Sequence, residues 1–248
     1  MRLLRAAWRL FRAVLHALHG LLVVLLILPS AKASERHARV RWWSARLLQV
    51  MGIQLRVQGS FKPGSKLLVA NHISWLDIMA IHAVCPEARF VSKADVQSWP
   101  LIGRLVDAGG TLYIQREKRR DALRVVHQMA EALRAGDTVA VFPEGTTAEG
   151  HVLLPFHANL LQAAIATELP VQPLALRYSD DESPVSRAAQ YVGDTTLAQS
   201  LWMLARAQGL VVSLRVLPPQ GSAHADRRAL AHQLRAEITE ALSGLDAA

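Results

Sequence analysis

The sequence predicts an α/β fold in which a mostly parallel sheet is flanked by helices. From about Gln58 onward, short apolar runs alternate with stretches of helical periodicity, the pattern of α/β proteins. Several of these runs are apolar throughout, as strands are when helices cover both faces of a parallel sheet. The length of 248 residues allows one such domain and a small appendage.

Six strands and four helices are predicted in this globular part. The strands are expected at Lys66–Ala70, Arg89–Val91, Thr111–Gln115, Thr138–Phe142, Val171–Tyr178 and Leu210–Val216. The helices are expected at Trp75–Val84, Asp121–Ala135, Asn159–Glu168 and Arg227–Leu242. Ser179–Ser186, a polar stretch that contains Pro184, is expected to be a surface loop. The sequence has no internal repeat and no Walker or GxGxxG loop.

Residues 1–57 have a different composition, and we predict that they form a membrane-associating pair of helices ahead of a domain spanning 58–248. Arginines precede an apolar run of 16 residues, Ala13–Leu28. At about 1.5 Å per residue, a helix of that length falls short of a ~30 Å hydrocarbon core. A cleavable signal peptide, a spanning helix in a locally thinned bilayer and a helix dipping into one leaflet are the three alternatives.

The next segment, residues 38–52, favours an uncleaved anchor over a signal peptide. Its apolar positions recur at helical spacing, and Trp42 and Trp43 are of the type that settles at headgroup depth. An ordinary core-packing helix is the alternative. The arginines before the apolar run place the amino terminus on the cytoplasmic side.

A formal net charge of +8 favours anionic partners: nucleic acid, phosphorylated metabolites or acidic lipids. Nucleic acid is not expected, because the tryptophans lie mostly in the amino-terminal half and no nucleic-acid-reading element is evident. The single cysteine, Cys85, excludes an internal disulfide and is expected in the core.

The heptad "NHISWLD", residues 71–77, follows the first predicted strand and suggests both a helix cap and a catalytic pair. Ser74 and Asp77 have the spacing of a capping box, with Ser74 as N-cap. An Asp77 carboxylate directed back along the chain would reach His72, fix its tautomer and leave the other ring nitrogen free as a general base toward an alcohol. Without that pairing, His72 would be an incidental structural residue.

Two later stretches add binding groups. "GTLYIQR" is a strand that delivers Arg116 at its end, and an arginine fork suits phosphate. "AVFPEGTT" is an apolar strand that breaks into a turn, where Gly145 allows close backbone approach and Glu144 can accept hydrogen bonds from hydroxyls. A plain strand-to-loop turn is the alternative for the second stretch.

Together these stretches resemble the glycerolipid acyltransferases. "NHISWLD", "GTLYIQR", "FPEGT" and "LPVQPLAL" occur in the order and approximate spacing of that family's motifs, and "FVSKADVQSWPLIG" is similar to its segment carrying a lysine followed by Pro-x-x-Gly. The similarity covers about Lys66 to Leu176. It implies a glycerol-3-phosphate acyltransferase-like fold with an amino-terminal membrane helix pair, and cytosolic acyl-CoA or acyl carrier protein as donor. Because the similar proteins are bacterial, it also implies a location at the cytoplasmic face of a bacterial inner membrane. It implies no metal or redox cofactor.

The resemblance also assigns roles. His72 would deprotonate the acceptor hydroxyl, which attacks an acyl thioester, and Asp77 would orient His72. Arg116 would hold the acceptor's phosphate, with Lys93 as a helper. The remaining substrate-binding residues would be Asn71, Glu144, Gly145 and Thr146. A non-catalytic membrane-binding protein on the same fold is the alternative of another class, and the presence of both His72 and Asp77 disfavours it.

One position departs from the family pattern. Phosphatidic-acid-forming members commonly carry arginine after "FPEGT", where this chain has Thr147. A similar "FPEGTT", with a downstream "LPF" like Leu154–Phe156, occurs in members that acylate lyso-ornithine lipid, which has no phosphate. The sequence leaves both acceptors open, with 1-acylglycerol-3-phosphate placed first as the acceptor of the broader class.

Overall fold

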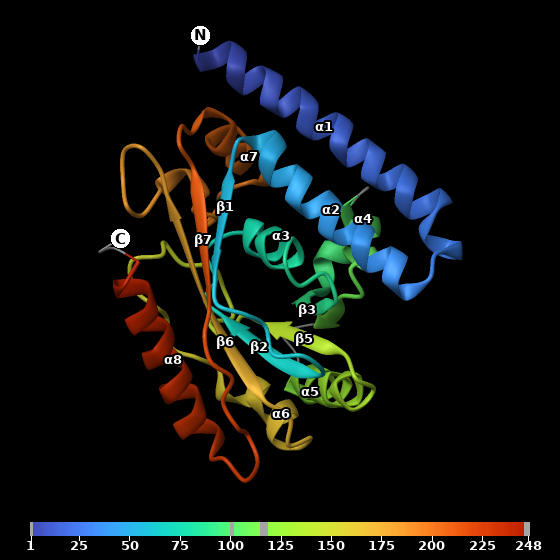
Figure 1. Cartoon of the computed structure of the whole chain (residues 1–248), viewed down its shortest axis with the longest axis vertical. Coiled ribbons are helices and arrows are strands. Elements are labelled where there is room, and N and C mark those ends of the chain that lie inside the picture. Colours follow the sequence, from blue (N-terminus) through green and yellow to red (C-terminus); the bar gives the residue numbers. More distant parts are fainter. Residues whose placement is uncertain (1, 100–101, 115–118, 246–248) are drawn as a thin grey trace.

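The computed structural model describes residues 2–99, 102–114 and 119–245, and its centre is a seven-stranded sheet (Figure 1). The strand order is β1-β7-β6-β2-β5-β3-β4. Every neighbouring pair is parallel except β6 and β7, so the prediction of an α/β fold with a mostly parallel sheet is confirmed. The strands are β1 (Gln54–Gln58), β2 (Lys66–Ala70), β3 (Ala88–Lys93), β4 (Leu112–Ile114), β5 (Thr138–Val141), β6 (Val171–Ser179) and β7 (Val211–Val216).

All six predicted strands are present, and β2 has the predicted bounds. The strand that the sequence did not predict is β1, which lies at the sheet edge and pairs with β7. Its sequence, "QLRVQ", is largely exposed, so it lacks the apolar run that marks the buried strands. The predicted boundary after residue 57 falls inside this strand.

The helices are α1 (Arg2–Leu26), α2 (Ala33–Met51), α3 (Leu76–His82), α4 (Ile102–Ala108), α5 (Arg119–Arg134), α6 (Gln162–Ile165), α7 (Leu197–Arg206) and α8 (Arg227–Ser243). Three of the four predicted helices correspond to α3, α5 and α8. The fourth is interrupted: a 3-10 turn, Ala158–Leu161, precedes the short α6, and Glu168 has a left-handed φ of 55°. The sequence did not predict α4 or α7.

Each face of the sheet carries its own apolar core. In β2, Leu68 and Ala70 face the cluster that includes residues of α1, α2, α3 and α7. Leu67 and Val69 face the opposite cluster, built with α5, α6 and α8. Figure 1 shows α8 on one side of the sheet and α2 and α3 on the other. A fully buried strand between two helix layers explains why "KLLVA" is continuously apolar.

The amino-terminal helices pack on one another and on the domain. The Trp43 indole donates to the carbonyl of His16 at 3.2 Å, and His16 Nε2 lies 2.9 Å from the Trp43 carbonyl. Gly20 permits this approach, because an added Cβ would lie 2.3 Å from Trp43 Nε1. Nearer the amino terminus of α1, Arg9 donates to the carbonyls of Ala205 and Ala207 at the end of α7.

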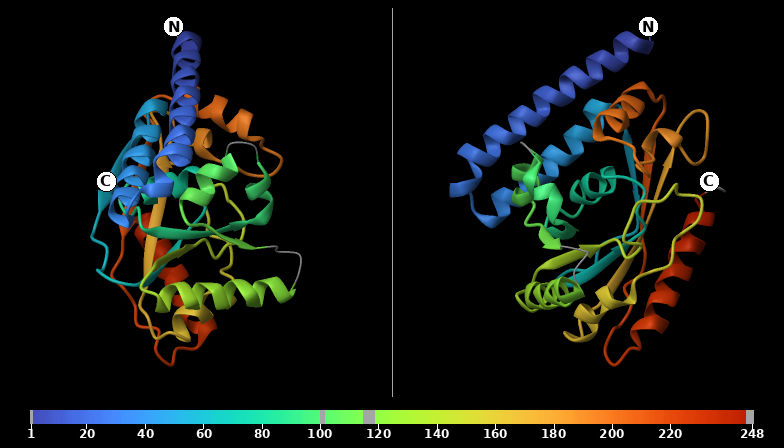
Figure 2. Two further views of the ribbon diagram at one scale, coloured as in Figure 1. Left: turned by 90° about the vertical axis from the view of Figure 1, so that its right-hand side faces the viewer. Right: turned by 180° about the vertical axis from the view of Figure 1, so that it is seen from behind.

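Among the described residues, α1 is the one helix long and apolar enough to cross a membrane by length and composition. Its amino-terminal end extends beyond the rest of the molecule (Figure 2). Large apolar side chains are exposed along it: Leu3, Leu4, Trp8, Phe11, Val14, Leu15, Leu18, Leu22, Leu25 and Leu26. Such a surface indicates membrane association of α1. By the same criteria α2 does not qualify, so a membrane-associated pair remains a prediction.

Candidate functional site

The predicted site residues that the structure describes gather at the carboxyl-terminal edge of the parallel strands. Asn71 and His72 follow β2, and Glu144 follows its neighbour β5. Carboxyl ends of adjacent parallel strands meet at one edge, which is where ligands of open α/β sheets bind. The topology therefore brings together motifs that lie 72 residues apart in the sequence.

His72 and Asp77 form the predicted pair. His72 Nδ1 lies 2.8 Å from Asp77 Oδ2, and the side chains are 17% and 0% exposed. The imidazole ring stacks on Phe142, with ring centroids 4.0 Å apart and planes 9° from parallel. The sequence analysis did not identify this aromatic support. With Nδ1 held by the carboxylate and one face covered, Nε2 is the ring atom left to exchange a proton with a substrate.

The predicted cap by Ser74 is wrong. Helix α3 begins at Leu76, and its N-cap, Trp75, makes no side-chain cap hydrogen bond. Asp77 Oδ2 instead accepts the backbone N–H groups of Ile73 and Ser74, at 2.7 and 3.0 Å. The Ser74 hydroxyl is buried without a hydrogen-bond partner among the described residues. The carboxylate thus fastens the turn before the helix and holds His72 with the same oxygen.

Asn71 has both ends of its side-chain amide on the backbone of β6. Its Nδ2 donates to the Leu176 carbonyl at 2.9 Å, and its Oδ1 accepts the Leu176 N–H at 2.8 Å. These two bonds continue the pairing of β2 with β6 past the end of β2. The side chain is buried and supports the segment that carries His72.

Glu144 is buried and bridges two loops. One carboxylate oxygen accepts the His72 N–H at 2.7 Å, and the other accepts the Leu154 N–H at 2.8 Å. Burial raises the pKa of Glu144, and these two backbone donors offset part of the rise. Arg235 of α8 donates to the carbonyl of Leu154 at 3.0 Å, so the bridged loop is also held from the opposite helix layer.

The turn after β5 depends on Gly145. This residue has a φ of 73°, and its N–H donates to the Phe142 carbonyl at 3.1 Å. A Cβ at this position would lie 2.9 Å from the His157 ring. Glycine meets both requirements at once. Thr146, next along the turn, is exposed at this edge of the sheet.

Thr147 connects the turn to a third loop. Its hydroxyl donates to the carbonyl of Tyr191, and the Tyr191 N–H donates to the Ile73 carbonyl at 3.1 Å. The N–H of Ala148 donates to the His72 carbonyl at 2.8 Å. The loop between β6 and α7 is therefore bonded both to the turn after β5, through Thr147, and to the segment after β2, through Ile73.

Of the two predicted cationic residues, the structure describes the backbone of Lys93 alone. Lys93 ends β3 and pairs in register with Ile114 of β4, and its side chain is not among those described. Arg116 lies outside the described residues. Strand β3, which Lys93 ends, is parallel to β5, so Lys93 lies at the same edge of the sheet as the residues that follow β2 and β5.

Besides Phe142, sequence reasoning missed Tyr178. Its hydroxyl donates to Asp77 Oδ1 at 2.8 Å, and its side chain is buried in β6. The two residues lie 101 positions apart. Their meeting follows from the adjacency of β2 and β6 in the sheet, which no local spacing indicates.

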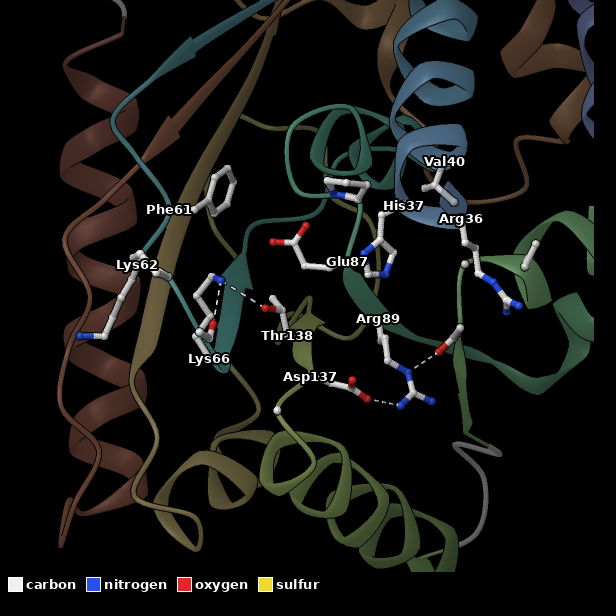
Figure 3. A pocket seen from close by; sticks show the side chains of 17 residues that line it. Arg36, His37, Val40, Phe61, Lys62, Lys66, Glu87, Arg89, Asp137 and Thr138 are labelled. Atoms are coloured by element: carbon white, nitrogen blue, oxygen red, sulfur yellow. Dashed lines mark hydrogen bonds and ion pairs between the residues drawn. The ribbon is translucent and has the colours of Figure 1, made fainter. Parts of the chain in front are cut away.

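A cavity of about 410 Å³ lies at the opposite edge (Figure 3). It is lined by residues at the amino ends of strands, including Lys66 of β2 and Thr138 of β5, and by Arg36 and His37 of α2. Lys66 Nζ donates to the Gly64 carbonyl and to the Thr138 hydroxyl, at 3.1 and 3.2 Å. Because β2 and β5 separate this cavity from His72 and Glu144, we do not assign the pair's chemistry to it.

Within residues 2–99, 102–114 and 119–245, no group of three or more His, Cys, Asp and Glu side chains is arranged to hold a metal ion. The described site consists of two buried carboxylates, Asp77 and Glu144, an imidazole, and hydrogen bonds from backbone and phenol. Such groups perform acid–base chemistry on a substrate that brings its own hydroxyl.

The sequence is similar to those of known proteins. The acyltransferase family matches residues 54–177. A lyso-ornithine lipid O-acyltransferase of Pseudomonas aeruginosa is 38% identical over 88% of this chain and 83% of its own length. A 1-acyl-sn-glycerol-3-phosphate acyltransferase of Neisseria gonorrhoeae is 34% identical over 77% of this chain and 73% of its own.

The fold also has a solved counterpart. The crystal structure of the 1-acyl-sn-glycerophosphate acyltransferase PlsC from Thermotoga maritima superposes with a TM-score of 0.76 at 20% identity, covering 100% of this chain and 99% of that one. At 20% sequence identity, this similarity shows a shared fold. The family match, the relatives and the shared architecture agree, and the chain belongs to the PlsC-like acyltransferase family.

Proposed function

We propose that this acyltransferase moves an acyl chain from a thioester to the hydroxyl of a lysolipid, with His72 as the general base. The observation that carries the proposal is the 2.8 Å contact between His72 Nδ1 and the buried carboxylate of Asp77. A carboxylate in that position keeps Nδ1 protonated and stabilises the imidazolium that forms when Nε2 takes a proton. The donors proposed are acyl-CoA or acyl carrier protein.

The reaction forms one C–O bond and breaks one C–S bond. His72 Nε2 removes the proton of the acceptor hydroxyl while the oxygen attacks the thioester carbonyl carbon, forming a C–O bond. The tetrahedral intermediate collapses, the C–S bond breaks and its electron pair leaves on sulfur. The imidazolium returns its proton to the thiolate. The products are the acylated lipid and a free thiol, and His72 is restored.

The other predicted residues have supporting roles in this proposal. Asn71 and Glu144 hold the backbone around His72, since their side chains are committed to backbone groups. Gly145 and Thr146 form the turn nearest the acceptor. Arg116, with Lys93, binds a phosphate or a headgroup carboxylate.

For the acceptor, we place lyso-ornithine lipid before 1-acylglycerol-3-phosphate, reversing the order that the sequence alone favoured. The Thr147 hydroxyl is bonded to the Tyr191 carbonyl, so this position contributes a loop contact where phosphate-using members carry a cation. Relatives from Pseudomonas aeruginosa and Rhizobium meliloti, at 38% and 34% identity, are lyso-ornithine lipid O-acyltransferases. The Neisseria relative and the predicted Arg116 support 1-acylglycerol-3-phosphate as the second candidate.

The location proposed is the cytoplasmic face of a bacterial inner membrane, reached by α1 with α2 lying beside it. Trp42 of α2 is exposed and lies against the His16 and His19 rings of α1. A tryptophan at a helix pair's outer surface suits the headgroup region. Residues 1–57 are proposed as the membrane-associating unit and 58–248 as the acyltransferase domain.

The test is a direct competition between acceptors. Purified protein in detergent micelles receives lyso-ornithine lipid and 1-acylglycerol-3-phosphate together, with radiolabelled acyl-CoA or acyl carrier protein. We expect labelled ornithine lipid to exceed labelled phosphatidic acid. Label mainly in phosphatidic acid would reverse the order of acceptors, and label in neither lipid would overturn the proposed function.

Thr147→Arg is expected to change the acceptor preference. A guanidinium beside the turn adds a charge-assisted contact to phosphate, so the ratio of kcat/KM for 1-acylglycerol-3-phosphate over lyso-ornithine lipid should rise about tenfold. Thr147→Val is the control, because it removes the bond to the Tyr191 carbonyl without adding charge. Thr147→Val should change kcat/KM for both acceptors by the same factor. If the ratio of kcat/KM values is the same in Thr147→Arg and Thr147→Val, position 147 has no role in acceptor choice.

A further inference from the structure

Asp77 sits in a fully enclosed position where each carboxylate oxygen has its own partners. The side chain is 0% exposed. Oδ2 receives the N–H groups of Ile73 and Ser74 and faces His72 Nδ1 at 2.8 Å. In the part of the chain that the structure describes, the donor that reaches Oδ1 is the phenol of Tyr178, at 2.8 Å.

Tyr178 is buried in a position where its hydroxyl hydrogen-bonds to the Asp77 carboxylate. It lies on β6, next to β2, and its side chain is 1% exposed. Burial raises the pKa of Tyr178 well above its ordinary value, and the charge of Asp77 adds to the rise. The phenol therefore stays protonated throughout the range in which an imidazole base works, and it remains a hydrogen-bond donor.

A donor on Oδ1 has a consequence for the proton on His72. Hydrogen bonds to an ionised carboxylate favour the ionised form and lower its affinity for a proton. The Ile73 and Ser74 amides can only donate, and the phenol donates to the other oxygen, so both carboxylate oxygens act as acceptors. This arrangement favours the Asp77 anion with the hydrogen on Nδ1 of His72. Without the phenol, Oδ1 would be a buried, unpaired anionic oxygen, which is costly.

We propose that Tyr178 is a positioning residue for acyl transfer: its phenol donates to Asp77 Oδ1 and keeps that carboxylate ionised and oriented on His72. The reacting pair at the end of β2 is thus completed by a third residue from β6. This inference rests on the proposed function for its kinetic part only, because the hydrogen-bond state of His72 can be measured without any substrate.

The first experiment is Tyr178→Phe, which retains the ring and removes the donor. Loss of a donor to the anion favours uptake of the first proton by the His72–Asp77 pair, so the acid limb of the pH profile of kcat should move to higher pH. We expect kcat to fall about tenfold, the equivalent of one hydrogen bond of about 1.4 kcal/mol, with KM for both substrates unchanged. Tyr178 bearing a 3-fluoro substituent, a stronger donor, should move the limb to lower pH.

Tyr113→Phe is the matched control. Tyr113 also donates to an aspartate, Asp107, at 2.6 Å, but this pair is exposed near the edge strand β4. Its loss should leave the acid limb unchanged. If the acid limb of the pH profile of kcat stays in place in both Tyr178→Phe and the fluorinated protein, Tyr178 is a packing residue only. This holds whatever the changes in kcat or in melting temperature.

The second experiment separates this inference from the proposed function. NMR titration of the His72 ring in the substrate-free protein should show a higher midpoint in Tyr178→Phe than in the wild type. That shift is expected even if no lysolipid is acylated, so inactive wild-type protein would overturn the function and leave this result standing. An identical His72 midpoint in the two proteins would overturn the positioning role.

Discussion

His72→Ala is expected to lower kcat by about 10²–10⁴-fold, the usual contribution of a general base. The His72 Nδ1 atom is paired with Asp77, which leaves Nε2 to take the proton of the acceptor hydroxyl. Among the described residues, no other base pairs with Asp77. The ring is partly exposed and contributes mainly its stacking on Phe142 to stability. Acyl transfer by purified protein and a thermal melt measure the two effects.

The matched control is His127→Ala. His127 lies on α5, exposed, with its Nε2 3.2 Å from a carboxylate oxygen of Glu131. This pair reproduces the chemistry of a histidine beside an acid at a place remote from the catalytic edge, so its loss should leave kcat unchanged. Full activity in a folded His72→Ala protein would rule out the pair as the source of catalysis.

Glu144→Gln is expected to reduce both activity and stability. Both carboxylate oxygens accept backbone N–H groups, from His72 and Leu154. An amide offers one acceptor, so one N–H would face an NH₂ group in a buried position, at about 1–3 kcal/mol of unfolding free energy. Because one of these bonds positions the backbone of His72, kcat should fall by about 10–100-fold. Denaturant unfolding and initial rates measure the two effects.

Glu149→Gln provides the comparison, since Glu149 is exposed in the loop that follows the same turn. It should retain wild-type stability and kcat. The resemblance to known acyltransferases implied a different role for Glu144, direct binding of the acceptor. If Glu144→Gln raises only the KM for the lysolipid and leaves the unfolding free energy unchanged, acceptor binding is the better account.

The buried centre of the fold was predictable because burial on both faces leaves a local signature. "KLLVA" is apolar at all five positions, so β2 was predicted with its observed bounds. The edge strand β1 carries Gln54, Arg56 and Gln58 in an exposed position, so nothing in its composition distinguishes it from a linker. Side-chain patterning reports burial, and an edge strand is held by backbone hydrogen bonds that any sequence can make.

At the site, contacts between near neighbours were predictable and contacts between strands were not. The pairing of His72 with Asp77 spans five positions and follows from a turn leading into a helix. The same local reasoning misassigned Ser74: Asp77 accepts the Ser74 N–H as in a capping box, but the Ser74 hydroxyl makes no return bond to the helix. The roles of Glu144 and Tyr178 depend on strand order, which a single sequence does not specify.

The contact between Arg9 and the end of α7 has a consequence for how the enzyme would meet its lipid. A helix joined by a slack linker lets a domain sample many heights and tilts above a bilayer. Here the guanidinium is bonded to the carbonyls of Ala205 and Ala207, and α2 is clasped to α1 through Trp43. With α1 as the membrane anchor, protein packing would set the height of His72 above the bilayer. A lysolipid drawn out of the bilayer to reach that height would lose about 0.8 kcal/mol for each methylene withdrawn, and this cost would be the same for every acceptor that shares the acyl chain.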